Sequence, residues 1–132
     1  MICGIGVDLV DIERVRKLLV HQRERTLRII FGPTEVALAL AQVPTREASY
    51  VAGRLAAKEA VLKVLGTGIG PLTLHEIAIT RSDMGQPGVQ VLGRAVPIAA
   101  ALGIQRWHLS LSHERGLVIA FAVAEQGPCT GH

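Results

Sequence analysis

Two acidic residues stand in apolar surroundings in this sequence and could bind a metal ion together. Asp8 closes the apolar run of residues 5–7, and Glu59 lies within the helix-forming segment 54–63. A carboxylate at the end of a buried strand must be hydrogen-bonded, ion-paired or metal-bound, because burying it alone is costly. Mg²⁺ is typically held by one or two carboxylates together with water and substrate phosphates, so the pair favours phosphate-ester transfer.

Positive charge accompanies Glu59 on the same predicted helix. Arg54 and Lys58 fall within the apolar arc of that helix, and Lys63 follows Glu59 by one turn. The first two either extend their charged ends to water along aliphatic stems or form an anion site. Lys63 either supports the helix as an ion pair with Glu59 or faces a ligand.

A third polar group ends a predicted strand near the C-terminus. Apolar and polar residues alternate over 107–112, which is typical of a half-buried strand, and His113 follows at its end. His113 is either structural or, together with Ser112, a phosphate ligand.

Other chemistries fit less well. The five histidines form no H-x-x-x-H pair and the two cysteines lie near opposite ends of the chain, which argues against a zinc hydrolase. The serine-hydrolase elbow motif is absent. Cys3 and Cys129 lack metal-like spacing, so we expect a reduced, cytoplasmic protein. No apolar run approaches the roughly 18 residues of a membrane-spanning helix, so we expect no membrane partner.

These residues must be positioned by one mixed domain. We expect an α+β fold over residues 1–125, in which an antiparallel sheet packs against a long helix, and a disordered tail over 126–132. Asp11 should cap the first helix and Thr34 a short one that ends near Ala41. The predicted strands cover 3–9, 76–81, 89–92, 107–111 and 117–124. The predicted helices cover 12–19, 27–31, 34–41, 44–65 and 94–102, and the longest ends at the glycine-rich segment from Gly66.

Composition bears on partners. Charged residues make up 19% of the chain and hydrophobic ones 49%, so we expect an oligomer to cover apolar surface. Basic residues gather between positions 14 and 28 and are either a solvated face or a docking site for an acidic partner. They are Arg14, Arg16, Lys17, Arg23, Arg25 and Arg28. Nucleic acid is a weaker candidate, because this stretch contains no aromatic residue for base stacking.

Three segments resemble one known family. They are GIGVDLVDIERV from position 4, RLAAKEAVLKVLGTGI from position 54 and HLSLSHE from position 108. Their joint presence resembles the holo-acyl-carrier-protein synthases, the short type of 4′-phosphopantetheinyl transferase. The resemblance covers nearly the whole chain to about Glu125. The loop at 32–35 and the tail depart from the family pattern.

The resemblance implies an activity and assigns roles. Members move 4′-phosphopantetheine from coenzyme A to a serine of apo acyl carrier protein, release 3′,5′-ADP and support fatty acid biosynthesis. By this likeness Asp8 and Glu59 hold Mg²⁺ and act in catalysis, and Lys63 stabilises the phosphate oxygens. Coenzyme A would also contact Arg54, Lys58, Gly66, Ser112 and His113. The basic residues 14–28 would meet an acidic helix of the carrier protein, and three copies would form a trimer with active sites between subunits. The general base is either Glu59 or a water molecule.

Two other classes of function remain as alternatives. A non-catalytic nucleic-acid-binding module would use the basic stretch but has no need of Asp8 or Glu59, and its affinity would fall steeply with salt. A structural oligomerisation protein would explain the low charge but not the cations in the apolar arc of the long helix.

Overall fold

The computed structural model describes residues 1–66 and 72–127 of the chain. Its strands are β1 (Ile2–Asp11), β2 (Ile77–Arg81), β3 (Pro87–Val91), β4 (Ile104–Glu114) and β5 (Leu117–Gln126). Its helices are α1 (Ile12–Ile30), α2 (Val36–Leu40), α3 (Pro44–Leu65), the 3₁₀ helix η1 (Leu74–Glu76) and α4 (Ala95–Ala101). The predicted α+β class is confirmed.

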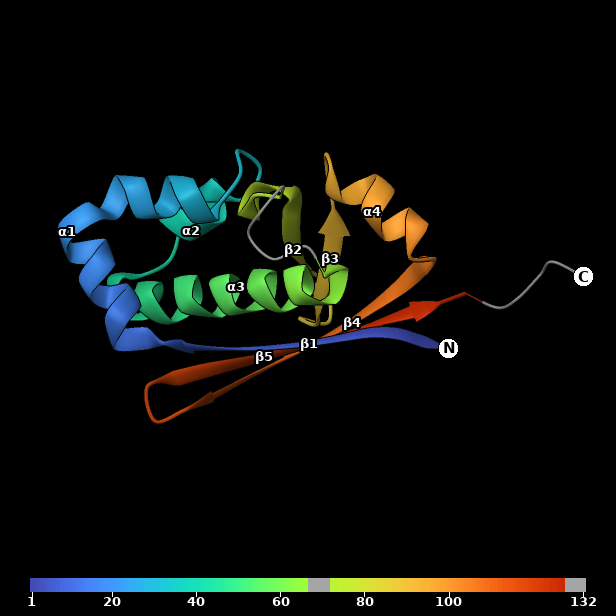
Figure 1. The fold of residues 1–132 in the computed structure, drawn as a ribbon. Coiled ribbons are helices and arrows are strands. Elements are labelled where there is room, and N and C mark those ends of the chain that lie inside the picture. The colour runs from blue at the N-terminus through green and yellow to red at the C-terminus, as the bar shows by residue number, and fades with distance from the viewer. Residues whose placement is uncertain (67–71, 128–132) are drawn as a thin grey trace, which may run out of the picture.

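The long helix α3 lies across a three-stranded antiparallel sheet in the order β1-β5-β4 (Figure 1). In this sheet Asp8 of β1 stands opposite Ala120 of β5. The inner face of β5 carries fully buried alanines, and α3 presents alanines towards the sheet, so helix and strands approach closely. The sheet thereby fixes β1 directly against the helix that carries Glu59.

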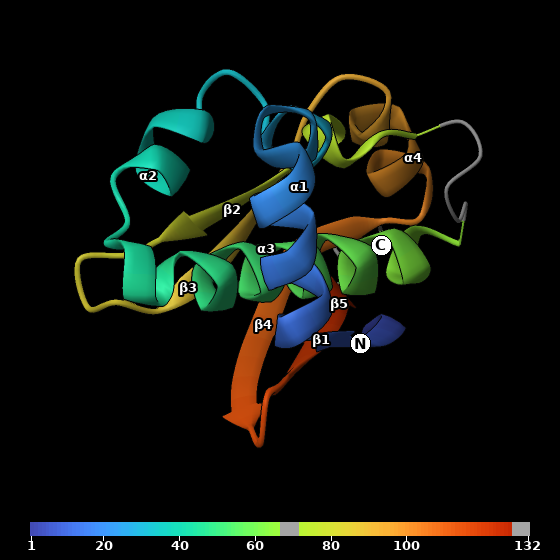
Figure 2. The ribbon, with the colours of Figure 1, turned by 90° about the vertical axis from the view of Figure 1, so that its left-hand side faces the viewer.

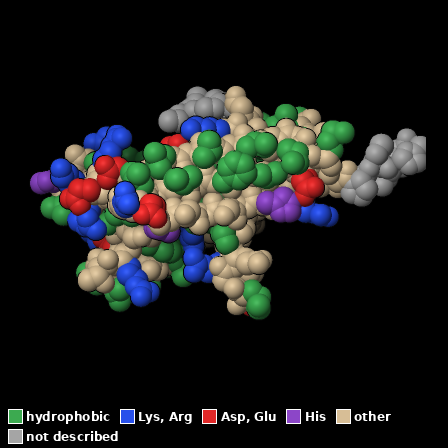
Figure 3. All heavy atoms as spheres, turned by 90° about the horizontal axis from the view of Figure 1, so that it is seen from below, with side chains coloured by type: hydrophobic (Ala, Val, Ile, Leu, Met, Phe, Trp, Pro, Cys, Tyr) green, Lys and Arg blue, Asp and Glu red, His purple; other side chains and the backbone are tan. Residues whose placement is uncertain are grey.

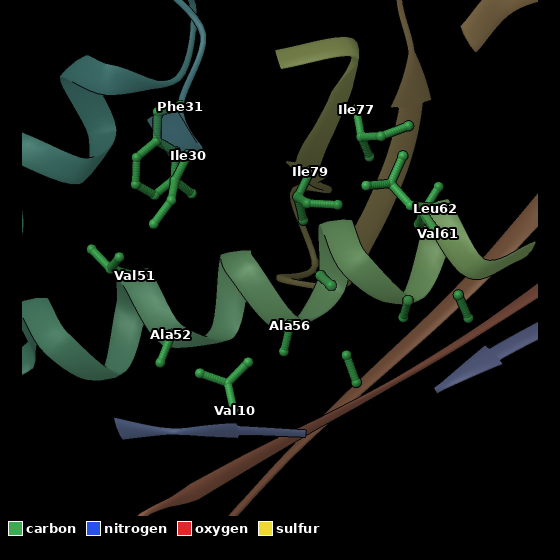
Figure 4. Packing of buried hydrophobic residues seen from close by; sticks show 14 of the residues in the cluster. Val10, Ile30, Phe31, Val51, Ala52, Ala56, Val61, Leu62, Ile77 and Ile79 are labelled. Atoms are coloured by element: carbon green, nitrogen blue, oxygen red, sulfur yellow. The ribbon is translucent and has the colours of Figure 1, made fainter. Parts of the chain in front are cut away.

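A second layer covers the opposite side of α3. The hairpin β2–β3 and residues Ile30 and Phe31 at the end of α1 pack there, while Val10 and the three-stranded sheet lie beneath (Figure 4). Helix α1 crosses α3, with α2 and α4 to either side (Figure 2). Because α3 is enclosed by both layers, Arg54 and Lys58 in its apolar arc are both buried.

Local signals explain the start of α1 and the end of α3. The Asp11 side chain accepts a hydrogen bond from the Glu13 amide, which confirms the predicted cap of α1. Gln22 interrupts α1 with non-helical dihedral angles, in the expected gap between two helical stretches. Gly66 ends α3 in the left-handed conformation that glycine adopts without strain.

Three details differ from the sequence-based expectations. The predicted Thr34 cap is wrong: Glu35 precedes α2 and its side chain is engaged elsewhere. The expected single sheet is two sheets, because β2–β3 pairs only with itself across the described residues. The predicted tail begins too early, since the Gln126 amide bonds the Met1 carbonyl at 2.8 Å and extends β5. Residues 128–132 lie outside the described part.

No helix in the described part of the chain is both long and apolar enough to cross a membrane.

Candidate active site

Asp8 lies on β1 beneath helix α3 and is mostly shielded from solvent. Its Oδ1 atom accepts a hydrogen bond from the Lys63 ammonium at 3.1 Å, and the same ammonium donates to the Val7 carbonyl at 2.8 Å. Its Oδ2 atom is buried and has no hydrogen-bond partner. A buried carboxylate oxygen without a partner is unfavourable unless a ligand supplies the missing contact.

Glu59 approaches Asp8 from α3, as the sequence predicted. The pKa of Glu59 is raised to about 7, chiefly by burial and next by the adjacent Asp8 carboxyl group, whereas the positive charges of Lys63 and Arg14 oppose the shift. Two carboxyl groups this close cannot both ionise freely without a cation. A shared cation would relieve their repulsion.

The donor set fits a hard divalent cation that is only partly held by protein. Asp8 and Glu59 offer oxygen ligands, and no group of three or more metal-binding side chains occurs in the described part of the chain. Mg²⁺ suits such a site because it keeps water and phosphate oxygens in its shell. The residues present therefore fit Mg²⁺ better than Zn²⁺, which prefers four nitrogen or sulfur ligands.

Glu59 borders cavities on both sides. One, of about 170 Å³, also has Arg14, Leu18 and Leu55 in its walls. The other, of about 530 Å³, has walls from Arg28, Leu62 and the segment 72–75. An acceptor and a donor substrate could thus approach one carboxylate from different directions.

A separate, basic groove of about 400 Å³ lies along the first half of α3. Arg54 and His113 both line it. The Arg54 guanidinium stacks on Tyr50, 4.8 Å from the ring centre, and no salt bridge to it occurs within residues 1–66 and 72–127. A well-shielded cation facing a groove without an acidic partner suits a phosphate. Asp8 and Glu59 do not line this groove.

The groove contains two further arginines that the sequence reasoning did not single out. Arg46 comes from the first turns of α3 and Arg81 from the end of β2. Arg46 lies eight positions before Arg54, so helical periodicity gave a weak signal for it. Arg81 had no such signal, because only the packing of β2 against α3 brings it there.

Two residues assigned to coenzyme A lie elsewhere in this chain. Lys58 is fully buried and donates to the Ile30 and Leu74 carbonyls and to the Glu35 carboxylate, so no donor remains for a ligand. Ser112 is exposed and does not line the groove of His113, because neighbouring side chains of a strand point to opposite faces. Lys58 therefore has no donor left for coenzyme A, and Ser112 and His113 do not face the same groove. Gly66 is exposed at the end of α3.

The basic stretch forms an exposed face of α1. All six predicted residues are exposed, and basic side chains gather towards the α1 end of the molecule in Figure 3. Arg16 pairs with Glu13, and Arg23 pairs with Glu47 of α3 at 2.7 Å. Arg14 and Arg28 contribute to the two cavities at Glu59. The basic face therefore borders both cavities at Glu59.

Comparison with known proteins identifies the chain's family. Residues 4–122 match the family model described as the 4′-phosphopantetheinyl transferase superfamily. The chain belongs to this superfamily. The matched span includes the Asp8–Glu59 pair, the basic face and the groove of Arg54 and His113, so the family resemblance noted in the sequence is confirmed.

Similar members of the superfamily have been named and solved. A holo-[acyl-carrier-protein] synthase of Maridesulfovibrio salexigens is 39% identical over 127 residues, which is 96% of this chain and 100% of the relative. The crystal structure of the synthase from Neisseria meningitidis has a TM-score of 0.86 and 34% identity, covering 96% of this chain and 100% of that one. A Bacillus anthracis synthase in complex with CoA (3′,5′-ADP) has a TM-score of 0.79 and 31% identity, covering 96% and 99%.

Proposed function

We propose that this protein transfers 4′-phosphopantetheine from coenzyme A to a serine of an apo acyl carrier protein in the cytoplasm, with Mg²⁺, and serves fatty acid biosynthesis. The observation that carries the proposal is the buried, unpartnered Oδ2 of Asp8 beside Glu59 and Lys63. Membership of the transferase superfamily and the likeness to a synthase in complex with CoA (3′,5′-ADP) support it.

Asp8 and Glu59 would hold Mg²⁺ in this proposal. When bound, the ion neutralises negative charge on the pyrophosphate of coenzyme A. Lys63 already points its ammonium at Asp8 and is half exposed, so it can turn to a phosphate oxygen at little cost. Lys63 would then stabilise charge that develops during transfer.

The chemical step is a substitution at phosphorus. The serine oxygen forms a bond to the β-phosphorus as the bond to the bridging oxygen breaks, and 3′,5′-ADP leaves. The serine proton passes to Glu59 or to a water molecule.

The nucleotide end of coenzyme A would lie in the basic groove. Arg54 and His113 offer a cation and a ring nitrogen to a phosphate, and Arg46 and Arg81 add positive charge to the same walls. The contact of Gly66 with coenzyme A is proposed from the family likeness alone.

We also propose a homotrimer with active sites between subunits. Hydrophobic side chains are exposed on the outer face of β1 and β5, the face seen in Figure 3. They are Ile5, Val7, Leu9, Ile119 and Phe121. Small monomers rarely leave such a contiguous face uncovered. Joining two subunits would also allow the groove of one to complete the Asp8–Glu59 site of its neighbour.

The carrier protein would dock on the basic face of α1. An acidic helix would meet Arg14, Arg28 and their neighbours, and its serine would reach Glu59 through the cavity that Arg14 borders. This route explains why positive charge lies beside the acids.

The decisive test is intact mass spectrometry of an apo acyl carrier protein incubated with this protein, coenzyme A and Mg²⁺. We expect a gain of one phosphopantetheine mass, which EDTA abolishes. No gain with several carrier proteins would contradict the proposal. A salt-dependent titration with nucleic acid would then test the binding alternative.

A further inference from the structure

Lys58 forms a buried junction at the centre of the protein. It is fully buried, and its ammonium donates to the Ile30 carbonyl at 2.7 Å, to the Leu74 carbonyl at 3.1 Å and to Glu35. The ring of Phe31 lies 5.4 Å from the same nitrogen. Every N–H bond of the lysine is therefore committed to the protein itself.

Glu35 extends this junction to a further element. Its Oε1 atom accepts from Lys58, and its Oε2 atom accepts from the Ile79 amide at 3.2 Å. The amide belongs to β2, and the carbonyls bonded by Lys58 belong to the end of α1 and to η1. One ion pair thus ties three peripheral segments to the middle of α3.

The tied segments are the outer walls of the larger cavity beside Glu59. One wall is the end of α1, at Arg28 and Ile29, and another is the segment 72–75. Lys58 bonds a carbonyl in or next to each wall, and α3 supplies the floor through Glu59 and Leu62. The His75 ring also contacts the Arg28 carbonyl and joins the two walls to each other. The Lys58 ammonium and the His75 ring together therefore set how far apart these walls stand.

Stability alone does not require this arrangement. Apolar residues of similar volume often replace a buried ion pair without loss of stability, because removing two charges from water is costly. An ion pair does, however, fix direction and distance more narrowly than apolar contacts do. Its position next to Glu59 links that narrow geometry to the reacting end of the site.

We propose that Lys58 and Glu35 are positioning residues that hold the walls of the cavity beside Glu59 at the width that the donor substrate requires. This inference rests on the proposed transferase function for its kinetic consequence. Its structural consequence is independent: without the pair, the segments 30–35 and 72–79 separate from α3 while β1, β4 and β5 remain in place.

The test compares substitutions within the pair with a core substitution elsewhere on α3. Lys58→Met keeps the aliphatic stem without the ammonium, and Glu35→Gln keeps the shape without the charge. The double variant K58M/E35M removes both charges. It is used in place of Lys58→Met if that single variant does not fold. Val61→Ala is the control, because Val61 is fully buried on α3 but lines neither cavity at Glu59.

Hydrogen–deuterium exchange gives the structural readout. We expect the amides of 30–35 and 72–79 to exchange about tenfold faster in Lys58→Met and Glu35→Gln than in Val61→Ala. The amides of β1 and β5 should exchange alike in all three. Equal exchange of the wall segments in the pair variants and the control would overturn the proposal.

Steady-state kinetics with coenzyme A and apo carrier protein, well below each unfolding temperature, give the functional readout. Both single variants should raise KM for coenzyme A by about tenfold and change kcat less, whereas Val61→Ala should change neither. A raised KM in Lys58→Met with an unchanged KM in Glu35→Gln would mean that Lys58 contacts substrate directly, and would overturn the proposal. If the wild-type protein transfers nothing, the proposed function fails, and exchange alone still decides the positioning role.

Discussion

Gly6 of β1 passes so close to Ala60 of α3 that a β-carbon on Gly6 would lie 2.0 Å from the Ala60 carbonyl oxygen. Only glycine permits this crossing. Asp8 follows two residues after Gly6, and Glu59 directly precedes Ala60, so the same crossing brings the two acids together. The glycine before the acidic residue is therefore part of how the site is built.

Gly6→Ala should destabilise the protein and separate the two carboxyl groups. The added methyl group meets backbone, which cannot move aside, so we expect a loss of about 3 kcal/mol or more in the free energy of unfolding. Urea denaturation measures it. Gly53→Ala is the matched control, since its β-carbon would have contacts no closer than 3.8 Å. That substitution lies within α3 and should be neutral or slightly stabilising. Equal stability of Gly6→Ala and wild type would refute the crossing argument.

Asp8→Ala and Glu59→Ala should each lower Mg²⁺-dependent transfer by about 100-fold or more while leaving the protein folded. Each substitution removes one of the two proposed protein ligands for the ion, and neither residue belongs to the apolar core. Initial rates over a Mg²⁺ titration, together with circular dichroism, check this. Wild-type rates in either variant would remove that residue from the site.

Stability without metal should depend on pH through Glu59. Its pKa in the folded protein, about 7, exceeds the ordinary value of 4.5, so the folded state binds the proton more tightly than the unfolded state. This contribution to stability is fully present below about pH 4.5 and is lost as pH rises through about 7. In EDTA, the unfolding temperature of the wild type should therefore fall between pH 6 and pH 8 relative to that of Glu59→Gln. Parallel curves for the two proteins would contradict the shifted pKa.

Charge reversal on the basic face should weaken carrier docking. Arg14→Glu or Arg28→Glu should raise KM for apo carrier protein by about tenfold, because each reverses a charge beside a cavity at Glu59. Added salt should reduce the difference from wild type. Arg115→Glu makes the same change of charge at the exposed β4–β5 turn and should leave KM unaltered. An equal effect of all three substitutions would indicate a response to net charge rather than a docking face.

The outer face of the three-stranded sheet should be the contact between subunits. Phe121→Lys places a charge on this apolar face and should convert the proposed trimer to monomers in sedimentation velocity. Met84→Lys, at an exposed turn, serves as the control and should leave the assembly intact. A wild-type monomer, or a trimer that tolerates Phe121→Lys, would contradict the proposed interface.

The sequence by itself determined the elements and their chemistry. Apolar periodicity and local caps such as Asp11 and Gly66 are short-range properties, so the helices and most strands could be predicted from neighbouring residues. The closeness of Asp8 and Glu59 was also predictable, because a carboxylate in an apolar segment needs a partner, although β1 continues to Asp11 and is buried on one face only. The family resemblance rested on the same segments.

The tertiary structure alone decided which charges serve the site. Arg54 and Lys58 occupy similar positions on one helix, and their surroundings separate them: Arg54 faces a groove, whereas Lys58 is enclosed by Ile30, Glu35 and Leu74. Helical periodicity gives the direction of a side chain but not what packs against it. Arg81 likewise joins the groove only through the packing of a distant hairpin against α3. The physical reason is that burial and partners come from segments far apart in the chain, which no local pattern encodes.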